Sequence, residues 1–478
     1  MSSEEIQTSA IPGKTEEQLS FIEYPIKSSN SVILSATAGS GKTFSAVERL
    51  KFMLANGVDP SKIVYFSFTV AAVQELKKRI NNEEIKITTI HSFCTHILAR
   101  MKKMRKISTF YDFIDWFKEA HKPKYGSPQK DSQQFYFEVE KLYDTAEYLS
   151  SEISAFKLQT ADGIKCKMPD YLKEYQRFAK ETKSIDFSDM LIQVRDALKE
   201  DKWLKMFRNQ YEYIFIDEYQ DTSTIQMQIL LSLNAKYYYL IGDKNQSIYG
   251  YSGANCDTIE AMLKRRRQTV EMNLSMNFRS AKLIVENSNK HSFLQATAFH
   301  KQDGAVHRKI ILFEQAVKIL KEKPSVAILV RTNSVIKELE KRLMILKIPM
   351  RYENYLKPAE LEDLMKAKER VATKNKMREL LPHFGTADAV IEFIRSNQDK
   401  ESFITTIHKS KGREFPVCIV VNSIAPEILK ENNIEVPKEY LSVLSYDPDD
   451  ENDYEARNVH YVAVSRAKDE LYFMYFEN

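Results

Sequence analysis

The sequence has few of the features that mark secreted, metal-binding or membrane-spanning proteins. Its 478 residues include four cysteines, which lie far apart without any Cys-x-x-Cys pair, so neither a disulfide framework nor a zinc site is predicted. The longest apolar runs, such as Pro416 to Val421, are far too short to span a membrane, and the first residues do not form a basic and then apolar leader. We therefore expect a cytoplasmic protein with no membrane partner.

An excess of either charge is also missing. The chain has 70 Lys and Arg residues against 66 Asp and Glu, which leaves a formal net charge of +4. Composition therefore does not by itself indicate a polyanionic partner. Two basic clusters, Lys102 to Lys106 and Lys264 to Arg267, could contact phosphates, although such runs are more often solvated faces of helices.

What the sequence does contain is a repeated alternation of short apolar strands with helical patterns. At this length we expect roughly three or four globular units. The expected strands are Ser31–Ser35, Lys62–Phe68, Tyr213–Asp217, Tyr237–Asp243, Ser325–Val330, Val417–Val421 and Leu471–Tyr475. Strands that alternate with helices pair in parallel. Because the runs fall into one group before about Ala254 and another after about Ser280, the sequence predicts two α/β domains.

Two further stretches follow a helical pattern throughout. Between Thr95 and Ser184, aromatic and lysine residues recur at helical spacing, as in Phe110 to Phe117 and Phe135 to Tyr148. This pattern predicts a helical insertion in the first domain. A shorter helical stretch, Ala359 to Asn397, interrupts the second domain, with a turn near Pro382 to Gly385.

A phosphate-binding loop follows the first expected strand. Glycines in such a loop let backbone N–H groups face the phosphates of a nucleotide, and a helix begins directly after it. Lys42 would reach the β and γ phosphates of ATP, and the Thr43 hydroxyl would ligate Mg²⁺. The residues expected to hold the nucleotide here are Ala38, Gly39, Ser40, Gly41, Lys42 and Thr43.

Two carboxylates stand at the end of a second buried strand, and nucleotide hydrolysis uses such groups. Of the adjacent pair Asp217 and Glu218, one can hold Mg²⁺ and the other can orient the attacking water. Gln246, after a third strand, has the reach to sense the γ-phosphate. Positive charge against the separating phosphates could come from Arg279 and Arg466, each of which would by itself be interpreted as a surface arginine.

Taken together and in order, these segments resemble the UvrD/Rep/PcrA family of superfamily 1 helicases. The matching segments are Glu17-Gln18, Ala36 to Thr43, Ser67 to Arg79, Thr89 to Cys94, Ile185 to Leu191, Asp217 to Thr222, Gly242 to Ala254, Met276 to Ser280, Val330 to Asn333, Thr406 to Phe415 and Tyr461 to Lys468. The resemblance implies an α/β fold with two RecA-like parallel-sheet domains. The implied boundaries are 1–94 and 185–275 for domain 1, 95–184 for its helical insertion, 276–358 and 401–478 for domain 2, and 359–400 for a short helical insertion.

The resemblance also implies roles at the nucleotide. Gln18 would read adenine, and Phe278 replaces the tyrosine that stacks on adenine in the family. Arg279 and Arg466 would close on the γ-phosphate. Gly412 and Glu414 would meet the nucleotide from the second domain, although Arg413 stands where the family has leucine. The implied cofactors are ATP and Mg²⁺, with Thr43 and Asp217 as the metal ligands.

A single-stranded nucleic acid can be bound without sequence readout by aromatic faces for its bases and by donors for its phosphates. The expected contacts are Phe68, Thr69, His91, Phe187, Tyr249, Tyr251, Thr406 and His408. For Phe68 and Tyr251 the resemblance implies stacking platforms, although core packing is the ordinary role of an aromatic residue. Three departures from the family pattern, at Phe44, at Val70-Ala71 and at Ser252, predict altered nucleotide and phosphate contacts.

Residues 360–363 resemble the motif that precedes subdomain 2B, which in the family swings, restrains unwinding and meets partners. Only some forty residues separate this motif from Thr405, so we expect subdomain 2B to be reduced to about two helices. Unwinding by this chain would then differ from that of its longer relatives.

The expected function is an ATP-dependent DNA helicase or translocase that moves 3′ to 5′ on single-stranded DNA in replication, repair or recombination. We expect it to bind single-stranded DNA, and junctions between single-stranded and duplex DNA, as a monomer. Its possible partners are replication or repair proteins, and its expected location is the cytoplasm of a bacterial cell or phage-infected host. Two alternatives stay open: a translocase that strips proteins from DNA with little unwinding, and a recombination mediator with a vestigial ATPase. A fused nuclease is disfavoured because the chain ends soon after Lys468.

Overall fold

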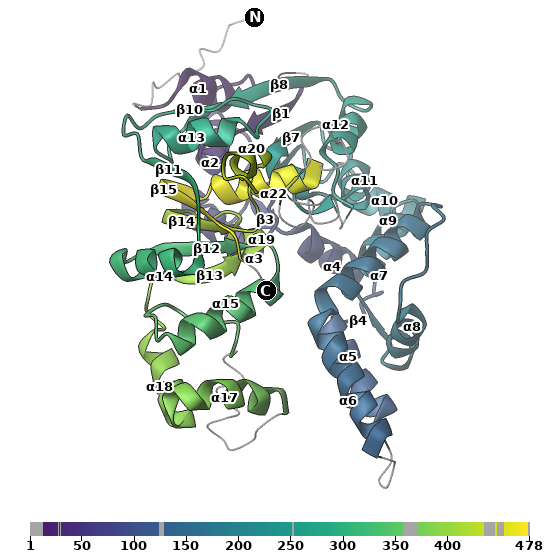
Figure 1. The fold of residues 1–478 in the computed structure, drawn as a ribbon. Helices are drawn as coiled ribbons and strands as arrows, with labels where there is room; N and C mark the ends of the chain where they lie inside the picture. The colour runs from purple at the N-terminus through teal and green to yellow at the C-terminus, as the bar shows by residue number, and fades with distance from the viewer. Residues whose placement is uncertain are drawn as a thin grey trace, which may run out of the picture. The chain divides into compact units, whose positions relative to one another are not determined.

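The structure is a computed structural model that describes residues 13–26, 28, 30–123, 129–250, 253–356, 371–434, 445–446 and 454–476. These residues form two compact units (Figure 1). Unit 1 comprises residues up to 35 together with 42–273, and unit 2 comprises residues 36–41 together with those from 274 onward. Each unit is built around its own β-sheet, and no helix within the described residues is long and apolar enough to cross a bilayer.

The sheet of unit 1 has six strands in the order β3-β2-β6-β7-β1-β8. Their bounds are β1 (Ser31–Ala36), β2 (Ile63–Phe66), β3 (Lys86–Thr88), β6 (Tyr213–Asp217), β7 (Tyr237–Gly242) and β8 (Thr269–Leu274). The pairs β1–β7, β6–β7, β2–β6 and β2–β3 are all parallel. Because Ser35 pairs with Gly242, and Asp217 with Ile241, the carboxyl ends of β1, β6 and β7 meet at one edge of the sheet.

Helices of unit 1 cover the sheet, with two short 3₁₀ turns at its carboxyl edge. The helices are α1 (Glu16–Ile22), α2 (Lys42–Ala55), α3 (Val70–Ile80), α9 (Phe187–Ala197), α10 (Asp201–Phe207), α11 (Thr224–Ser232) and α12 (Cys256–Lys264), and the 3₁₀ turns are η1 (Pro60–Lys62), η2 (Tyr219–Asp221) and η3 (Lys244–Gln246). The turns η2 and η3 directly follow β6 and β7, which places the motif residues after each strand at the same edge.

A helical region extends unit 1 (Figure 1). Its helices are α4 (Ile90–Arg100), α5 (Phe110–His121), α6 (Gln129–Asp144), α7 (Ala146–Ala161) and α8 (Leu172–Glu181). Side chains from α5 to α8, including Phe113, Leu142 and Phe178, form a core of their own. Two strands of two residues each, β4 (Lys106–Ile107) and β5 (Ser184–Ile185), pair in parallel at its base. This pair was not predicted from the sequence.

Unit 2 contains a five-stranded sheet in the order β11-β15-β14-β12-β13, with all four neighbouring pairs parallel. The strands are β11 (Ala305–Ile311), β12 (Val326–Val330), β13 (Phe403–Thr406), β14 (Phe415–Val421) and β15 (Ala467–Met474). A separate parallel pair joins β9 (Met276–Asn277) to β10 (Thr297–Ala298). The predicted α/β class with two parallel sheets is therefore confirmed.

Aliphatic side chains from several helices of unit 2 form one core with β12 and β14. The helices of this unit are α13 (Lys282–Asn289), α14 (Phe313–Glu322), α15 (Asn333–Ile345), α17 (Val371–Phe384), α18 (Ala387–Ser396), α19 (Ile407–Ser410), α20 (Pro426–Glu431) and α22 (Tyr454–Val464). The turn expected from Pro382 begins later, because Pro382 lies inside the last turn of α17. The chain reverses at Gly385, whose φ is +81°.

Candidate functional site

Three carboxylates gather where the central strands of unit 1 end. Asp217 is the last residue of β6, Glu218 follows it, and Asp243 comes directly after β7. Asp217 and Asp243 are buried, with 8% and 1% of their surface exposed. Burial and the neighbouring charge of Glu218 raise the pKa of Asp217 to about 7, and burial also raises the pKa of Asp243. The site therefore holds more negative charge than its surroundings stabilise.

Lys42, the first residue of α2, supplies positive charge to this cluster. Its Nζ lies 3.4 Å from Oε2 of Glu218. Burial alone would lower the pKa of Lys42, but the attraction of Glu218, Asp243 and Asp217 outweighs burial and raises it. The ammonium group is therefore charged at neutral pH. Thr43 follows in the first turn of α2, partly buried.

The backbone at Glu218 is held in a conformation that few residues adopt. Its φ of +51° lies in the left-handed region, which costs on the order of 1 kcal/mol for a residue with a side chain. The Gln220 amide donates a short hydrogen bond to Glu218 Oε2 and accepts one of 3.1 Å from the Asp243 N–H. A Cβ at residue 242 would lie 2.2 Å from Gln220 Oε1, so only glycine lets β7 approach this closely.

Gln246 lies in η3 and is tied to the same cluster. Its Nε2 donates to Oδ2 of Asp243 over 2.7 Å, while Oδ1 of Asp243 accepts the N–H of Asn245. The structure therefore brings Lys42, Asp217, Glu218 and Gln246 together within unit 1. Asp243 and Gln220 complete the cluster; both lie in the motifs quoted above, but sequence reasoning assigned neither of them a role.

Gln18 lies in the first turn of α1. The helix begins with a capping box, in which the Thr15 N–H donates to Gln18 Oε1 and the Gln18 N–H donates to the Thr15 hydroxyl, each over 3.2 Å. The Gln18 side chain is 3% exposed. This geometry fixes the carbonyl end of the side chain at the start of the helix.

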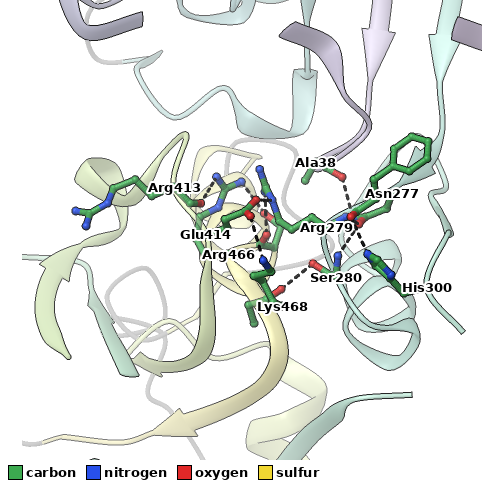
Figure 2. Close-up of polar contacts among 12 residues, drawn as sticks. Ala38, Asn277, Arg279, Ser280, His300, Arg413, Glu414, Arg466 and Lys468 are labelled. Carbon is green, nitrogen blue, oxygen red and sulfur yellow. Dashed lines mark hydrogen bonds and ion pairs between the residues drawn. The ribbon is translucent and has the colours of Figure 1, made fainter. Parts of the chain in front are cut away.

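The loop of residues 36–41 belongs to unit 2, where it contacts the segment around β9 (Figure 2). Asn277 Nδ2 donates to the Ala38 carbonyl oxygen over 2.7 Å, and the Phe278 N–H donates to the Gly39 carbonyl oxygen over 2.9 Å. The Ala38 N–H donates to the Tyr461 hydroxyl over 3.2 Å. Gly39 and Gly41 both have positive φ, as expected for a loop that turns sharply before a helix.

Both candidate arginines of unit 2 are held by oxygen acceptors (Figure 2). Arg279 Nε donates to Glu414 Oε2 over 2.8 Å and Nη1 donates to the Ser465 carbonyl oxygen over 3.2 Å. Arg466, only 1% exposed, donates from Nε to the Val462 carbonyl oxygen and from Nη1 to that of Arg413. The structure therefore brings Arg279, Glu414 and Arg466 together in one cluster.

Glu414 also receives a second cation. Lys468 Nζ lies 3.4 Å from its other carboxylate oxygen. Burial would raise the pKa of Glu414, but Arg279 and Lys468 together hold it below its ordinary value. Sequence reasoning did not assign Lys468 a role, although it lies in the last motif.

An open cavity of about 410 Å³ lies beside this cluster in unit 2. It is lined by Gly39, Gly41, Phe278, Arg279, Ala281, His300, Gln302, Glu414, Lys468 and Asp469. The Phe278 ring lies 5.0 Å from the ring of Phe299, centroid to centroid, and His300 Nε2 donates to the Phe278 carbonyl oxygen over 2.8 Å. A glycine-rich loop, an aromatic ring and cationic side chains suit a nucleotide.

Gly412 has a φ of +80° and open space around it. The next residue, Arg413, turns its guanidinium toward the rings of Phe403 and Phe415, 4.6 and 5.3 Å from their centroids. In Figure 2 this side chain extends away from Glu414 and Arg466. The arginine that replaces the leucine of the family therefore packs as a cation against aromatic rings.

Exposed aromatic rings of unit 1 form two pairs. Phe68, 44% exposed, stacks on Tyr249 with centroids 5.4 Å apart. Phe187, 47% exposed, meets His91 edge to face at 5.1 Å. Burial lowers the pKa of His91, which keeps this imidazole neutral near pH 7. These exposed faces can accept stacked bases.

The remaining expected nucleic-acid contacts have structural roles or lie elsewhere. The hydroxyls of Thr69 and Thr406 cap α3 and α19 by accepting the N–H groups of Ala72 and Lys409. Thr406 and the partly buried His408 belong to unit 2. Tyr251 lies outside the described residues, as do Ser252 and the segment 357–370.

Comparison with known proteins matches the chain in two blocks. Residues 15–267 match the UvrD/REP helicase N-terminal domain, and residues 357–478 match the UvrD-like helicase C-terminal domain. A protein of Mycoplasma capricolum described as a probable DNA helicase II homolog is 27% identical over 471 residues, covering 86% of this chain and 64% of that protein. The ATP-dependent DNA helicase PcrA of Staphylococcus epidermidis is 26% identical over 389 residues, covering 72% of this chain and 52% of PcrA. The chain therefore spans between about half and two thirds of these relatives.

Proposed function

This chain belongs to the UvrD/REP helicase family, and we propose that it is an ATP-driven motor that moves along single-stranded DNA and unwinds duplex DNA. The observation that carries the proposal is that each unit holds a charged cluster of its own. Unit 1 holds the buried Asp217 with the partly buried Glu218 and Lys42, and unit 2 holds Arg279 and Arg466 beside a cavity lined by the glycines of the phosphate loop.

In unit 1, we assign Lys42 to the β and γ phosphates, because its ammonium stays charged among the carboxylates. Glu218 would orient the attacking water and take its proton. Gln246, fixed through Asp243, would contact the γ-phosphate and report its release. Gln18, at the start of α1, would read the adenine base.

Mg²⁺ would be held by Asp217 and the Thr43 hydroxyl. Oxygen ligands from one or two carboxylates, completed by phosphates and water, are what this ion prefers. The raised pKa of Asp217 fits such a role, because a bound cation would stabilise the carboxylate form that burial disfavours. When bound, the ion would neutralise charge on the phosphates.

In unit 2, Arg279 and Arg466 would stabilise the charge that develops on the γ-phosphate. Their backbone and carboxylate acceptors keep both guanidinium groups oriented before a nucleotide binds. Phe278 would stack on the base, while Gly412 and Glu414 would line the nucleotide from this unit.

The DNA track we propose uses Phe68, Phe187 and Tyr249 as stacking faces, joined by Tyr251. His91, Thr69, Thr406 and His408 would contact the strand between them. Movement would run 3′ to 5′ in steps driven by ATP turnover. The small cavity of about 20 Å³ that is lined by Phe68, His91 and Asp217 supports coupling, because the base platform and the metal ligand share one packed region.

We further propose that subdomain 2B is reduced, since α17 and α18 are the helices described between α15 and β13. Unwinding would then be less restrained than in longer relatives.

If duplex unwinding is weak, the second candidate function is a translocase that strips proteins from single-stranded DNA. The same aromatic and polar residues of the proposed DNA track would serve this function. A monomer acting in replication or repair is the working assumption for both.

The proposal is tested by displacing streptavidin from biotinylated single-stranded DNA with ATP. The motor is expected to remove streptavidin from the 5′ end faster than from the 3′ end, as 3′ to 5′ movement requires. A partial duplex with a 3′ tail measures unwinding in parallel. Equal rates at both ends, or none that depends on ATP, would overturn the proposal; displacement without unwinding would favour the second candidate.

A further inference from the structure

Asn277, a buried residue at the end of β9, connects two parts of the candidate site in unit 2. It is 5% exposed. Its Nδ2 donates to the Ala38 carbonyl oxygen over 2.7 Å, and its Oδ1 accepts the N–H groups of Arg279 and Ser280, each over 2.8 Å. A single amide thus joins the phosphate loop to the backbone of a candidate arginine (Figure 2).

The partners fix which end of the amide faces which group. A carbonyl oxygen can only accept, so the NH₂ end must face Ala38, and two backbone N–H groups can only donate, so the oxygen must face Arg279 and Ser280. No rotation of the side chain satisfies these bonds otherwise. The connection therefore requires asparagine chemistry, with a donor and an acceptor on one short side chain.

The loop approaches this segment too closely for any side chain at Gly39. A Cβ there would lie 2.7 Å from Cβ of Arg279 and 3.0 Å from Oδ1 of Asn277. A second bond, from the Phe278 N–H to the Gly39 carbonyl oxygen, runs beside the first. Gly39 therefore has a use beyond exposing N–H groups to phosphate, because it also admits the segment that follows β9.

The far side of the same segment is anchored to other elements of unit 2. Ser280 Oγ donates to the Ala467 carbonyl oxygen over 2.7 Å, and His300 donates to the Phe278 carbonyl oxygen. With both flanks held, displacement of the loop carbonyl at Ala38 must be transmitted to Asn277, and from there to the backbone of Arg279.

We propose that Asn277 is a positioning residue that couples the phosphate loop to Arg279, so that the loop conformation adopted around a nucleotide sets the orientation of the arginine. This inference rests on the proposed function, because it takes the loop as a phosphate site and Arg279 as the group that meets the γ-phosphate. Asn277 itself need not touch the nucleotide.

The first test needs no hydrolysis. Amide hydrogen exchange of the protein without nucleotide is measured for residues 36–41 and 276–281 in three variants. Asn277→Ala loses both halves of the connection and is expected to exchange faster in both segments. Asn277→Asp keeps two acceptor oxygens but offers no N–H to Ala38, so exchange should rise in the loop alone.

Asn432→Ala is the matched control. Asn432 also makes three bonds of the same kinds, from Nδ2 to the carbonyl oxygens of Arg308 and Ile428 and to Oδ1 from the Ile310 N–H. It should leave both segments unchanged. The proposed coupling would be wrong if Asn277→Ala exchanged faster in only one of the two segments. It would also be wrong if Asn432→Ala exchanged faster in both segments.

The second test is a double-mutant cycle on ATP hydrolysis. Asn277→Ala is expected to lower kcat by about tenfold to a hundredfold, the range for misplacing a catalytic group, with a smaller change in KM. If Asn277 acts through Arg279, adding Asn277→Ala to Arg279→Ala should lower kcat no further than about twofold.

Additive losses in that cycle would show a merely structural role and overturn the inference. If the unaltered protein hydrolyses no ATP, the proposed function fails, and the exchange experiment still decides whether the connection exists. Should Asn277→Ala fail to fold, the loop-selective effect of Asn277→Asp decides the question alone.

Discussion

The charged clusters of the two units differ in their electrostatics. In unit 1, the carboxylates of Asp217, Glu218 and Asp243 crowd around the ammonium of Lys42, and burial raises the pKa of Asp217 to about 7. In unit 2, by contrast, Glu414 sits between Arg279 and Lys468, which hold its pKa below the ordinary value.

This contrast indicates the charge of the ligand that each cluster can bind. A site with surplus negative charge gains stability from a cation such as Mg²⁺, and a site with surplus positive charge gains stability from phosphate. The charges of unit 1 therefore suit a bound cation, and those of unit 2 suit a phosphate group. The predictions below separate the two clusters, starting with the largest expected effect.

Removing the cation of unit 2 should damage chemistry more than binding. Arg279→Ala is expected to lower kcat for ATP hydrolysis by about a thousandfold, the lower range for an arginine that stabilises the transferring phosphoryl group, with a small change in nucleotide affinity. Steady-state hydrolysis and binding of a fluorescent ATP analogue measure the two effects.

Arg308→Ala provides the matched control for that variant. Arg308 also lies in unit 2 and pairs with a glutamate, Glu431, over 2.7 Å. Its loss should leave kcat unchanged. If both variants lost activity equally, the effect would belong to unit 2 as a whole, and the role given to Arg279 would be wrong.

Neutralising a carboxylate of unit 1 should stabilise the protein without ligand. The pKa of Asp217 is raised to about 7 in the fold against about 4 in an unfolded chain, so the folded state binds the extra proton between these values. The contribution of Asp217 to stability is therefore highest below about pH 4 and falls as pH rises toward 7.

Asp217→Asn removes this dependence. The free energy of unfolding of this variant should exceed that of the unaltered protein by an amount that grows from pH 5 to 7 and then levels off. At about 1.4 kcal/mol per pKa unit, the difference should reach a few kcal/mol. Thermal unfolding without nucleotide or Mg²⁺ measures it, with Asp257→Asn, whose side chain is 90% exposed, as the control. If the stability of Asp217→Asn and that of the unaltered protein changed with pH in the same way, burial would not disfavour the charged form of Asp217.

A smaller effect, on DNA binding, is expected at the stacking residues of the proposed DNA track. Phe68→Ala should weaken binding of an oligo(dT) strand by about 1–3 kcal/mol, the contribution of one stacked base, while nucleotide binding stays the same. Phe293→Ala, which removes an aromatic ring of unit 2 that is 57% exposed against 44% for Phe68, should have no effect. Fluorescence anisotropy distinguishes the two, and equal losses would remove Phe68 from the track.

The buried strands of both sheets could be predicted because their residues are apolar and β-branched in unbroken runs, as in β6 and β12. The edge strands β3 and β11 could not. β3 has three residues, and β11 alternates half-buried and exposed positions with His307, Arg308 and Lys309 among them. Without apolar neighbours on both faces, such strands leave little pattern in the sequence.

The same limit applies to the candidate site. Lys42, Asp217, Glu218 and Gln246 lie at the ends of buried strands or within a few residues after them, so the strand pattern located them. The links of Ala38 to Asn277 and to Tyr461 join residues 239 and 423 positions apart, and no local pattern predicts such contacts. Asn277 and Tyr461 lie in quoted motifs, yet their function depends on what packs against them.

We propose that this chain hydrolyses ATP when it binds single-stranded DNA, and the rate of hydrolysis with and without oligo(dT) tests this directly. We expect clear stimulation by DNA, reduced by about a hundredfold or more in Glu218→Gln, as expected when a group that orients the nucleophile is lost. Glu212→Gln, which removes a half-exposed carboxylate paired with Lys236, should match the unaltered protein. Hydrolysis at the same rate with and without DNA, or full hydrolysis by Glu218→Gln, would exclude this function.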